Sequence, residues 1–419
     1  HGFTKSLLEE GIFQGLRIDH VDGLADPTMY LEQLRELCGE EVYIVVEKIL
    51  EPGEELPAVW PVQGTTGYDY LGLVNQLFTN DKAESRFDTF YKKLGRHSNE
   101  VHQLILKKNK AFLDCYMQGE LENLYQLLLS LRLIKRELTE DEQVLVKEVL
   151  SEILVRCPVY RFYSNQYPLL PAESELLQGI LGDIAKADPR YSQVVGLITE
   201  QVFPPRVTPD SAEKVLMFFK RLMQFTGPLM AKGVEDTLMY TYNRFIGNNE
   251  VGDSPEIFGI KPDDFHEQIS LRHKNWPNAM NATATHDTKR GEDARTRLTV
   301  LTDLRKEWIT EVKEWQRLNA GLKEDGSPDA NDEYFIYQTL VATYPEGDPV
   351  AENYEKRVLA YIEKALRESK RNSEWDEPDL EYEASTKAFI QGLLKPEGEF
   401  WERFTTFHKK VAAMGRTSS

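Results

Sequence analysis

The sequence has no long apolar run, few cysteines and a deficit of basic residues. No apolar segment approaches the ~20 residues of a membrane-spanning helix, and the start HGFTKSLLEE is not a signal peptide. The three cysteines, Cys38, Cys115 and Cys157, form no CxxC pair, which predicts a reducing, cytoplasmic setting without a disulfide framework. With 50 basic and 69 acidic residues, the net charge is −19. This charge argues against nucleic-acid or membrane-surface partners and suits a neutral, hydroxyl-rich one.

The length of 419 residues allows a large core and two or more domains. The chain begins with a histidine rather than Met, and its end, GRTSS, resembles an arbitrary stop. We therefore expect it to be a piece of a longer protein.

The first 79 residues alternate between strand and helix patterns. GLRID (15–19) predicts a buried strand, and the β-branched run EVYIVVEKIL (41–50) predicts a second strand that is buried on both faces. Between them, ADPTMYLEQLREL has the helical period behind an early proline. A strand, a helix and a strand in this order form a βαβ unit, so we expect two parallel, adjacent strands.

Helical patterns dominate the remainder of the chain. Residues 80–222 predict an α-helical insertion that the aromatic loop YRFYSNQYPLLP interrupts. Residues 223–298 return to glycine-bounded motifs, and residues 299–419 are mostly helical in pattern. The sequence thus predicts an α/β fold: central βα units in 1–79, the insertion, a returning segment and a helical C-terminal part.

Asp19 follows the first predicted strand. In a βα barrel, a side chain at this point faces the catalytic mouth. Arg17 points to the same side of the strand, and its charge would keep Asp19 ionised, as a nucleophilic carboxylate requires. A structural Arg–Asp pair that caps a loop is the alternative, and this motif alone favours it.

Glu47 lies near the end of the second predicted strand, after four apolar residues. If the two strands are parallel neighbours, Glu47 and Asp19 face one mouth. A Glu in partly apolar surroundings has a raised pKa and can act as an acid. An ionised Asp and a protonated Glu, ~5–5.5 Å apart, are the pair that a retaining glycosidase uses. The alternative for Glu47 is a salt bridge to Lys48 or to a loop.

The third cluster is ATATHDTKRGEDARTR, in which a strand-like run ends at Ala284 and Thr285. It could be a solvated loop before a helix, and His286 with Asp287 could be a metal pair. Together with Asp19 and Glu47 it has another interpretation, in which Asp287 grips sugar hydroxyls and favours the distorted transition state while His286 donates to the same hydroxyls.

The motifs RIDHVDG, VVEK and THD resemble the α-amylase superfamily of retaining glycoside enzymes. By position, this resemblance implies that Asp19 is the nucleophile and Glu47 the general acid/base. It implies that His286 and Asp287 stabilise the transition state, and that Arg17 is the arginine before the nucleophile.

Longer blocks narrow the resemblance. GLRIDHVDGLADP, WPVQGTTGYDYL, MAKGVEDT, NNEVG and NATATHDTKRGEDARTRL are similar to the maltooligosyl trehalose synthase family, and they extend to about residue 298. The family implies intramolecular transglucosylation, in which the reducing-end α-1,4 bond of a maltooligosaccharide becomes an α,α-1,1 bond. It implies no cofactor and no metal.

The resemblance also implies a (β/α)8 TIM-type barrel with the nucleophile on the fourth strand. Residues 1–14 cannot supply three strands, and the chain stops before the eighth. We therefore expect a partial barrel, with a further strand near Tyr68, and a chain that is inactive by itself. An exposed sheet edge could pair two copies into a homo-oligomer.

Further residues are candidates for contact with the sugar chain. Lys232, Glu235 and Asp236 in AKGVEDT could hold the released glucose or form a loop salt bridge. Aromatic side chains could stack on sugar rings or belong to the core, and core is favoured for Tyr70. The full substrate-binding set is Arg17, His20, His286, Lys232, Glu235, Tyr68, Trp60, Lys289 and Arg290.

Three other functions stay open. A simple α-glucan hydrolase would use the same carboxylates, but the long synthase-like blocks argue against it. A metal-dependent phosphohydrolase could use His20, Asp22, His286 and Asp287 as ligands, but the acidic chain lacks a basic phosphate cradle. A non-catalytic glycan-binding fragment would bind without turnover.

Overall fold

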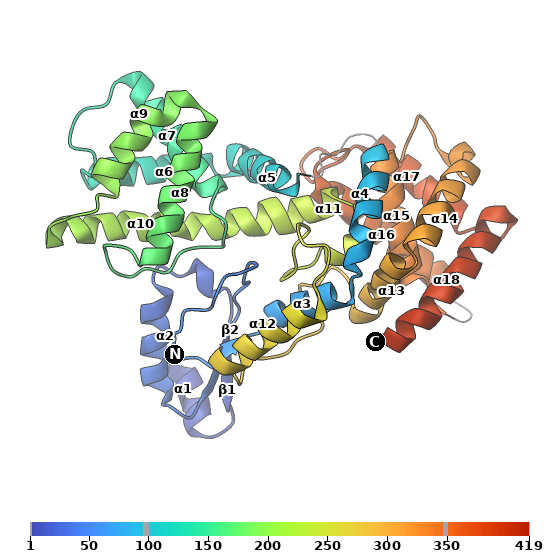
Figure 1. Cartoon of the computed structure of the whole chain (residues 1–419), viewed down its shortest axis with the longest axis horizontal. Coiled ribbons are helices and arrows are strands. Elements are labelled where there is room, and N and C mark those ends of the chain that lie inside the picture. Colours follow the sequence, from blue (N-terminus) through green and yellow to red (C-terminus); the bar gives the residue numbers. More distant parts are fainter. Residues whose placement is uncertain (1, 95–99, 347–350, 419) are drawn as a thin grey trace. The chain divides into compact units, whose positions relative to one another are not determined.

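The computed structural model describes residues 2–94, 100–346 and 351–418, which form two compact units (Figure 1). The first unit combines 1–66, 105–234 and 272–280, and the second combines 67–104, 235–271 and 281–419. Each unit therefore draws on several of the four segments expected from the sequence, and that four-part division stays a prediction.

The first unit contains a small parallel sheet. Its strands are β1 (Gly15–Ile18), β2 (Tyr43–Val46) and β3 (Gly64–Thr65), in the order β1-β2-β3. Helix α2 (Pro27–Cys38) connects β1 to β2, and it begins at Asp26, whose side chain accepts a hydrogen bond from the Met29 N–H. The prediction of a βαβ unit with parallel, adjacent strands is confirmed.

Three strand predictions need correction or refinement. Residues 44–46 of β2 are buried as predicted, but β1 alternates between exposed and half-buried residues, because it lies at the edge of the described sheet. The further strand predicted near Tyr68 is β3, which ends at Thr65, and Tyr68 itself begins helix α3. The strand-like run before His286 forms no strand.

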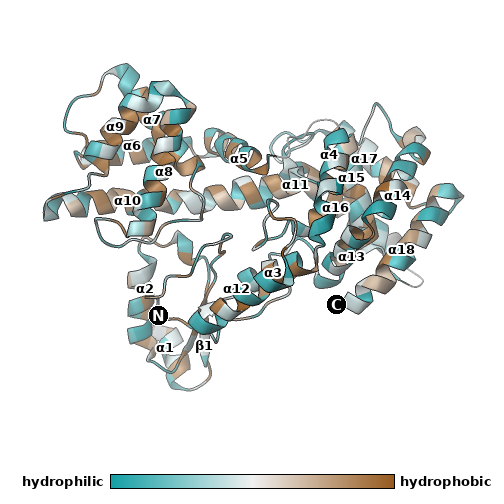
Figure 2. Ribbon diagram, in the orientation of Figure 1, coloured by the Kyte–Doolittle hydropathy of each residue, from teal (hydrophilic) through white to brown (hydrophobic). Residues whose placement is uncertain are grey.

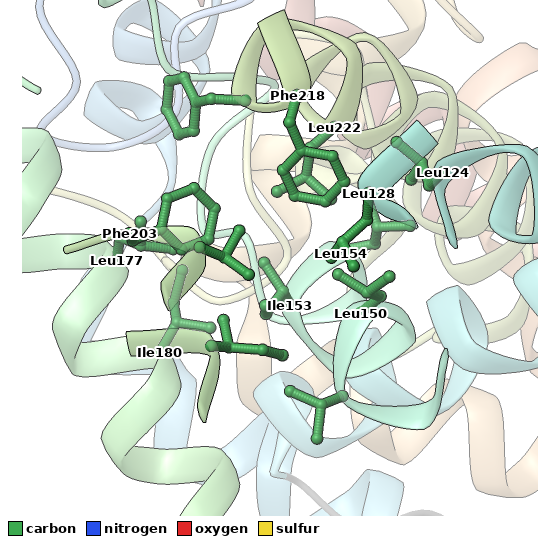
Figure 3. Close-up of a cluster of buried hydrophobic side chains, with 14 of the residues drawn as sticks. Leu124, Leu128, Leu150, Ile153, Leu154, Leu177, Ile180, Phe203, Phe218 and Leu222 are labelled. Atoms are coloured by element: carbon green, nitrogen blue, oxygen red, sulfur yellow. The ribbon is translucent and has the colours of Figure 1, made fainter. Parts of the chain in front are cut away.

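A helix that precedes the sheet and the helices between residues 101 and 229 complete the first unit. The latter helices pack around a buried apolar cluster drawn from residues 113–229, which includes Leu150, Phe218 and Leu222 (Figure 3). Each helix carries apolar and polar residues side by side (Figure 2), as amphipathic helices around a core do. The helices are α1 (Gly2–Glu9), α5 (Val101–Tyr116), α6 (Gln118–Ser130), α7 (Glu140–Val155), α8 (Pro171–Ala187), α9 (Ser192–Leu197) and α10 (Pro209–Leu229).

The second unit is helical, and α15 (Ala330–Thr343) is its most buried helix. Helix α13 (Glu292–Asp303) packs against both α15 and α18 (Gly398–Ser418). The other helices are α3 (Tyr68–Phe78), α4 (Glu84–Lys93), α11 (Met239–Thr241), α12 (Pro262–Asn275), α14 (Arg305–Leu318), α16 (Ala351–Ser369) and α17 (Leu380–Leu393). Helix α12 continues into the first unit, and α5 begins in the second.

The described residues thus form a mostly helical protein with a small parallel sheet. None of the described helices combines the length and the apolar character that crossing a membrane requires.

Candidate active site

The end of β1 and the end of β2 meet at one guanidinium. Arg17 Nη1 donates to the Asp19 carboxylate, and Nη2 donates to Glu47 Oε2 at 3.1 Å. Asp19 is the residue after β1, and Glu47 is the residue after β2. The parallel register aligns Ile18 with Val46, so the two carboxyl groups that follow these residues meet at the same edge of the sheet.

His20 completes this group through its backbone. Its φ of 44° and ψ of 53° are left-handed, and its N–H donates to Glu47 Oε2 at 3.0 Å. This sharp turn starts a short 3₁₀ helix, η1 (Val21–Gly23). A Cβ at position 23 would lie 2.5 Å from Cδ2 of the His20 ring, so this ring would have to shift if residue 23 were not glycine. The structure therefore brings together Arg17, Asp19, His20 and Glu47.

The two carboxyl groups have opposite pKa shifts. Hydrogen bonds from Glu47 and from Arg17 lower the pKa of Asp19. Burial, and then the hydrogen bond to Asp19, raise the pKa of Glu47 to about 6. The difference in exposure explains the split: 71% of the Asp19 side chain is accessible, against 19% for Glu47. Glu47 therefore keeps its proton to a higher pH than Asp19 does.

The side chains of Asp19 and Glu47 interact directly, since each shifts the pKa of the other. Arg17 bridges them by donating to both. The separation of ~5–5.5 Å that a retaining mechanism requires stays a prediction.

A buried lysine lies behind the pair. Lys48 pairs with Glu54 at 2.8 Å and lies 3.7 Å from Asp22 Oδ2, and its side chain is fully buried. Burial opposes its charge, but these two carboxylates outweigh burial and raise the pKa of Lys48. The alternative of a Glu47–Lys48 salt bridge is wrong, because Lys48 points into the core instead.

The aromatic loop of the helical segment binds the turn after β1. Tyr163 donates its hydroxyl to the Asp22 carboxylate, and burial, together with the Asp22 charge, raises the pKa of Tyr163 well above its usual value. Arg161 donates to the backbone carbonyls of Asp22 at 2.7 Å and Leu24 at 2.5 Å. The sequence predicts this aromatic loop but not its contact with the turn, because the contact joins residues far apart in the chain.

Helix α10 supports the same turn. Lys220 pairs with Asp26 at 2.6 Å, and Gln224 donates to the Gly23 carbonyl at 3.1 Å. The segment 160–224 therefore fixes the backbone that carries Asp19 and His20.

The second unit carries the third motif. Tyr68 donates its hydroxyl to Asp287 Oδ2, and His286 Nε2 lies 3.4 Å from the same oxygen. The Asp287 side chain is 40% accessible and that of His286 is 71% accessible. Because these residues belong to a different unit from Asp19 and Glu47, their convergence on one mouth stays a prediction.

Arg290 and Lys289 face inward. The Arg290 side chain is only 3% accessible and pairs with Glu250 at 3.0 Å. Lys289 is half-buried over the Tyr240 ring, with its Nζ 5.3 Å from the centroid, and burial lowers its pKa. Arg290 therefore supports the loop, and direct contact with substrate is not what its position favours.

The aromatic candidates divide in the same way. Trp60 is 2% accessible and donates its indole N–H to Thr28, so the core alternative fits it. Tyr68 is also buried, and only its hydroxyl is directed to the candidate site. Tyr70, for which core was favoured, is half-buried.

Lys232, Glu235 and Asp236 lie on a π-helix, η5 (Met230–Leu238), a rare conformation that is frequent at functional sites. Lys232 is exposed, and the two acidic residues are half-buried. Their role as glucose holders stays a prediction.

The ligand set of the phosphohydrolase alternative is not assembled within either unit. Asp22 is buried against Lys48 and Tyr163. Within the described ranges, no three His, Cys, Asp or Glu side chains lie close enough together to hold a metal ion.

We predict that Glu47 titrates at about 6, and that Asp19→Asn lowers this pKa. The substitution removes the anion that favours the protonated form, but burial of Glu47 remains. The measurement is ¹³C NMR of labelled carboxyl groups. Glu142, whose pKa the hydrogen bond from Arg136 lowers to about 2, is the internal control. A Glu47 pKa of 4.5, or one that does not respond to Asp19→Asn, would contradict this electrostatic account.

Comparison with known proteins agrees with the motifs. No family model matches the chain. A Mycobacterium tuberculosis protein, provisionally named a maltooligosyl trehalose synthase, is 30% identical over 395 residues, which cover 94% of this chain and 48% of that protein. The chain therefore spans about half the length of the curated relatives it matches.

Solved structures give the same result. The maltooligosyltrehalose synthase of Arthrobacter ramosus superposes with a TM-score of 0.84 and 28% identity, over 100% of this chain and 50% of that one. A Sulfolobus tokodaii protein described as a hypothetical maltooligosyl trehalose synthase superposes with a TM-score of 0.76 and 30% identity. The match covers 96% of this chain and 49% of that one. The resemblance found in the motifs is thus confirmed: over nearly its whole length, this chain is similar to about half of a maltooligosyl trehalose synthase.

Proposed function

We propose that this chain carries the catalytic carboxyl groups of an intramolecular transglucosylase. The enzyme would convert the reducing-end α-1,4 bond of a maltooligosaccharide into an α,α-1,1 bond. The observation that carries the proposal is the Arg17-bridged pair, in which the pKa of Glu47 is raised and that of Asp19 is lowered.

In the first step, Asp19 attacks the anomeric carbon and Glu47 protonates the departing glycosidic oxygen. The C–O bond to the terminal glucose breaks, and a glycosyl ester forms on Asp19. Glu47 is left ionised. Because its pKa is about 6, it can then act as the base of the next step near neutral pH.

In the second step, the released glucose turns over and attacks through its own anomeric hydroxyl. Glu47 takes the hydroxyl proton, the ester to Asp19 breaks, and the 1,1 bond forms with retention at the transferred carbon. Water must be kept out during this step. Lys232, Glu235 and Asp236 are our candidates for holding the glucose.

The named relatives favour this reaction over simple hydrolysis, since they are described as maltooligosyl trehalose synthases. The opposite pKa shifts favour catalysis over glycan binding alone, because binding does not need a protonated Glu beside an ionised Asp.

We further propose that the three strands belong to a (β/α)8 barrel and that His286 and Asp287 serve the same mouth as Asp19. The outer edge of β1 would then pair with another strand of the barrel, or with a second copy of the chain. The free cysteines among the described residues favour a cytoplasmic setting.

The reaction itself is the main test. Incubation of the complete gene product with maltopentaose should give a product of unchanged mass without a reducing end. A reducing-sugar assay and mass spectrometry measure these two properties. Asp19→Asn should lower turnover by at least ~10⁴-fold, because an amide cannot form the glycosyl ester.

Thr28→Ser, which changes a buried position of the same unit, is the control and should keep turnover. Release of free glucose with a new reducing end would favour the hydrolase. Full activity of Asp19→Asn would place the nucleophile elsewhere.

The 419-residue chain by itself should form no trehalose terminus. A barrel mouth is assembled from the loops after all its strands, whereas the described residues contain three strands. The measurement is the same assay with the purified chain beside the complete gene product. Equal turnover per mole in the two preparations would contradict this expectation.

A further inference from the structure

The buried segment Asn248–Asp253 consists of the motif NNEVG and the aspartate that follows it. The reaction proposed above gives it no role. Its residues are buried, apart from half-buried Gly252, and Glu250 is fully inaccessible. We propose that Glu250 is the positioning residue for Asp287. The expected effect on catalysis rests on the proposed function, whereas the positioning of the loop does not.

Glu250 holds the loop that carries Asp287. Its Oε2 accepts the backbone N–H of Lys289 at 2.6 Å, and its Oε1 accepts Nη1 of Arg290 at 3.0 Å. The same Arg290 nitrogen donates to the carbonyls of Ile246 at 3.1 Å and Asn249 at 3.2 Å. One carboxylate thus fixes the chain at the second and third residues after Asp287.

The same segment reaches Asp287 from a second side, through Tyr68. A Cβ on Gly252, whose φ is +87°, would lie 2.4 Å from the Tyr68 carbonyl oxygen. A Cβ on Gly72, one turn further along α3, would lie 2.0 Å from the Gly252 carbonyl oxygen. This backbone contact fixes the start of α3, from which the Tyr68 hydroxyl donates to Asp287.

Asp253 anchors the segment itself. It accepts hydrogen bonds from Gln76 at 2.7 Å, Asn75 at 3.2 Å and Asn248 at 3.2 Å, and from the Ser254 N–H at 2.7 Å. Gln76 and Asn75 belong to α3, so hydrogen bonds join the segment to that helix. The loop 285–290 has no regular secondary structure, and its contacts with Glu250 and Tyr68 hold it to the segment and to α3.

Burying the Glu250–Arg290 ion pair carries a desolvation cost that apolar side chains would not incur. A buried ion pair is often no more stabilising than apolar residues of similar volume, whereas it specifies one geometry. Glu250 thereby fixes the position of the backbone that follows Asp287. A carboxylate that contacts a transition state requires such a fixed position.

The test compares Glu250→Gln with Glu383→Gln. In the first variant, the amide that replaces the carboxylate would turn a donor toward Arg290 or Lys289. Glu383 is a matched control in the same unit, because its side chain is 3% accessible and it pairs with Arg367 at 2.7 Å between α17 and α16. Hydrogen exchange of the 419-residue chain is the structural measurement, and steady-state kinetics of the complete gene product is the catalytic one.

We expect Glu250→Gln to accelerate exchange in the peptide 283–291 by at least ~10-fold, with α15 unchanged. We expect kcat to fall on the order of 100-fold, with KM within about threefold, since a misplaced transition-state contact affects kcat. Glu383→Gln should leave both quantities at the wild-type level. Unchanged exchange at 283–291, wild-type kcat, or equal effects of the two substitutions would overturn the proposal. If the complete wild-type gene product forms no trehalose terminus, the proposed function fails, while the exchange measurement on the 419-residue chain still decides whether Glu250 positions the loop.

Discussion

The contact of one guanidinium with two carboxyl groups is the interaction on which the first unit depends. Arg17 donates to both carboxyl groups, and its charge lowers the pKa of each, which offsets their repulsion at the edge of the sheet. Burial of Glu47 outweighs this effect, so the pKa of Glu47 is raised while that of Asp19 is lowered. A rise in the pKa of Glu47 from 4.5 to about 6 corresponds to about 2 kcal/mol in favour of the protonated form. This preference is small enough for Glu47 to gain and lose its proton within one reaction cycle.

Much of the surrounding structure restrains the backbone of these two groups. Lys48, Asp22, Tyr163 and Arg161 form a buried polar network beneath the turn after β1. Removal of one partner from a buried ion pair costs about 3–5 kcal/mol, so this network restrains the turn strongly. The second unit has a similar arrangement, since the buried Glu250–Arg290 ion pair contacts the loop that carries Asp287. In both units, a buried ion pair supports an exposed carboxylate from behind.

Local patterns were sufficient for part of this picture. The βαβ unit, the burial of β2 and the approach of Asp19 to Glu47 followed from β-branched runs and the alternation of strand and helix, because these depend on near neighbours in the chain. The exposure of β1 did not follow, since it depends on which strands lie beside it. Tertiary contacts also determine the burial of Trp60, Arg290 and Lys48. Each of these residue types can lie at a surface and contact a substrate, but here each side chain is buried and paired inside the protein. The bracing of the turn by the loop around Tyr163 joins residues 141 positions apart, and no local pattern encodes such a contact.

The most direct test of the central claim is to trap the covalent intermediate on Asp19. α-Maltosyl fluoride needs no proton to release its leaving group, so Glu47→Gln should still form the ester and should break it slowly. Mass spectrometry of the complete gene product should then find a maltosyl group on the tryptic peptide of residues 18–35, and fragmentation should assign it to Asp19. A maltosyl group on another carboxylate, or no label in a protein that turns over the fluoride, would contradict the assignment of the two carboxyl groups.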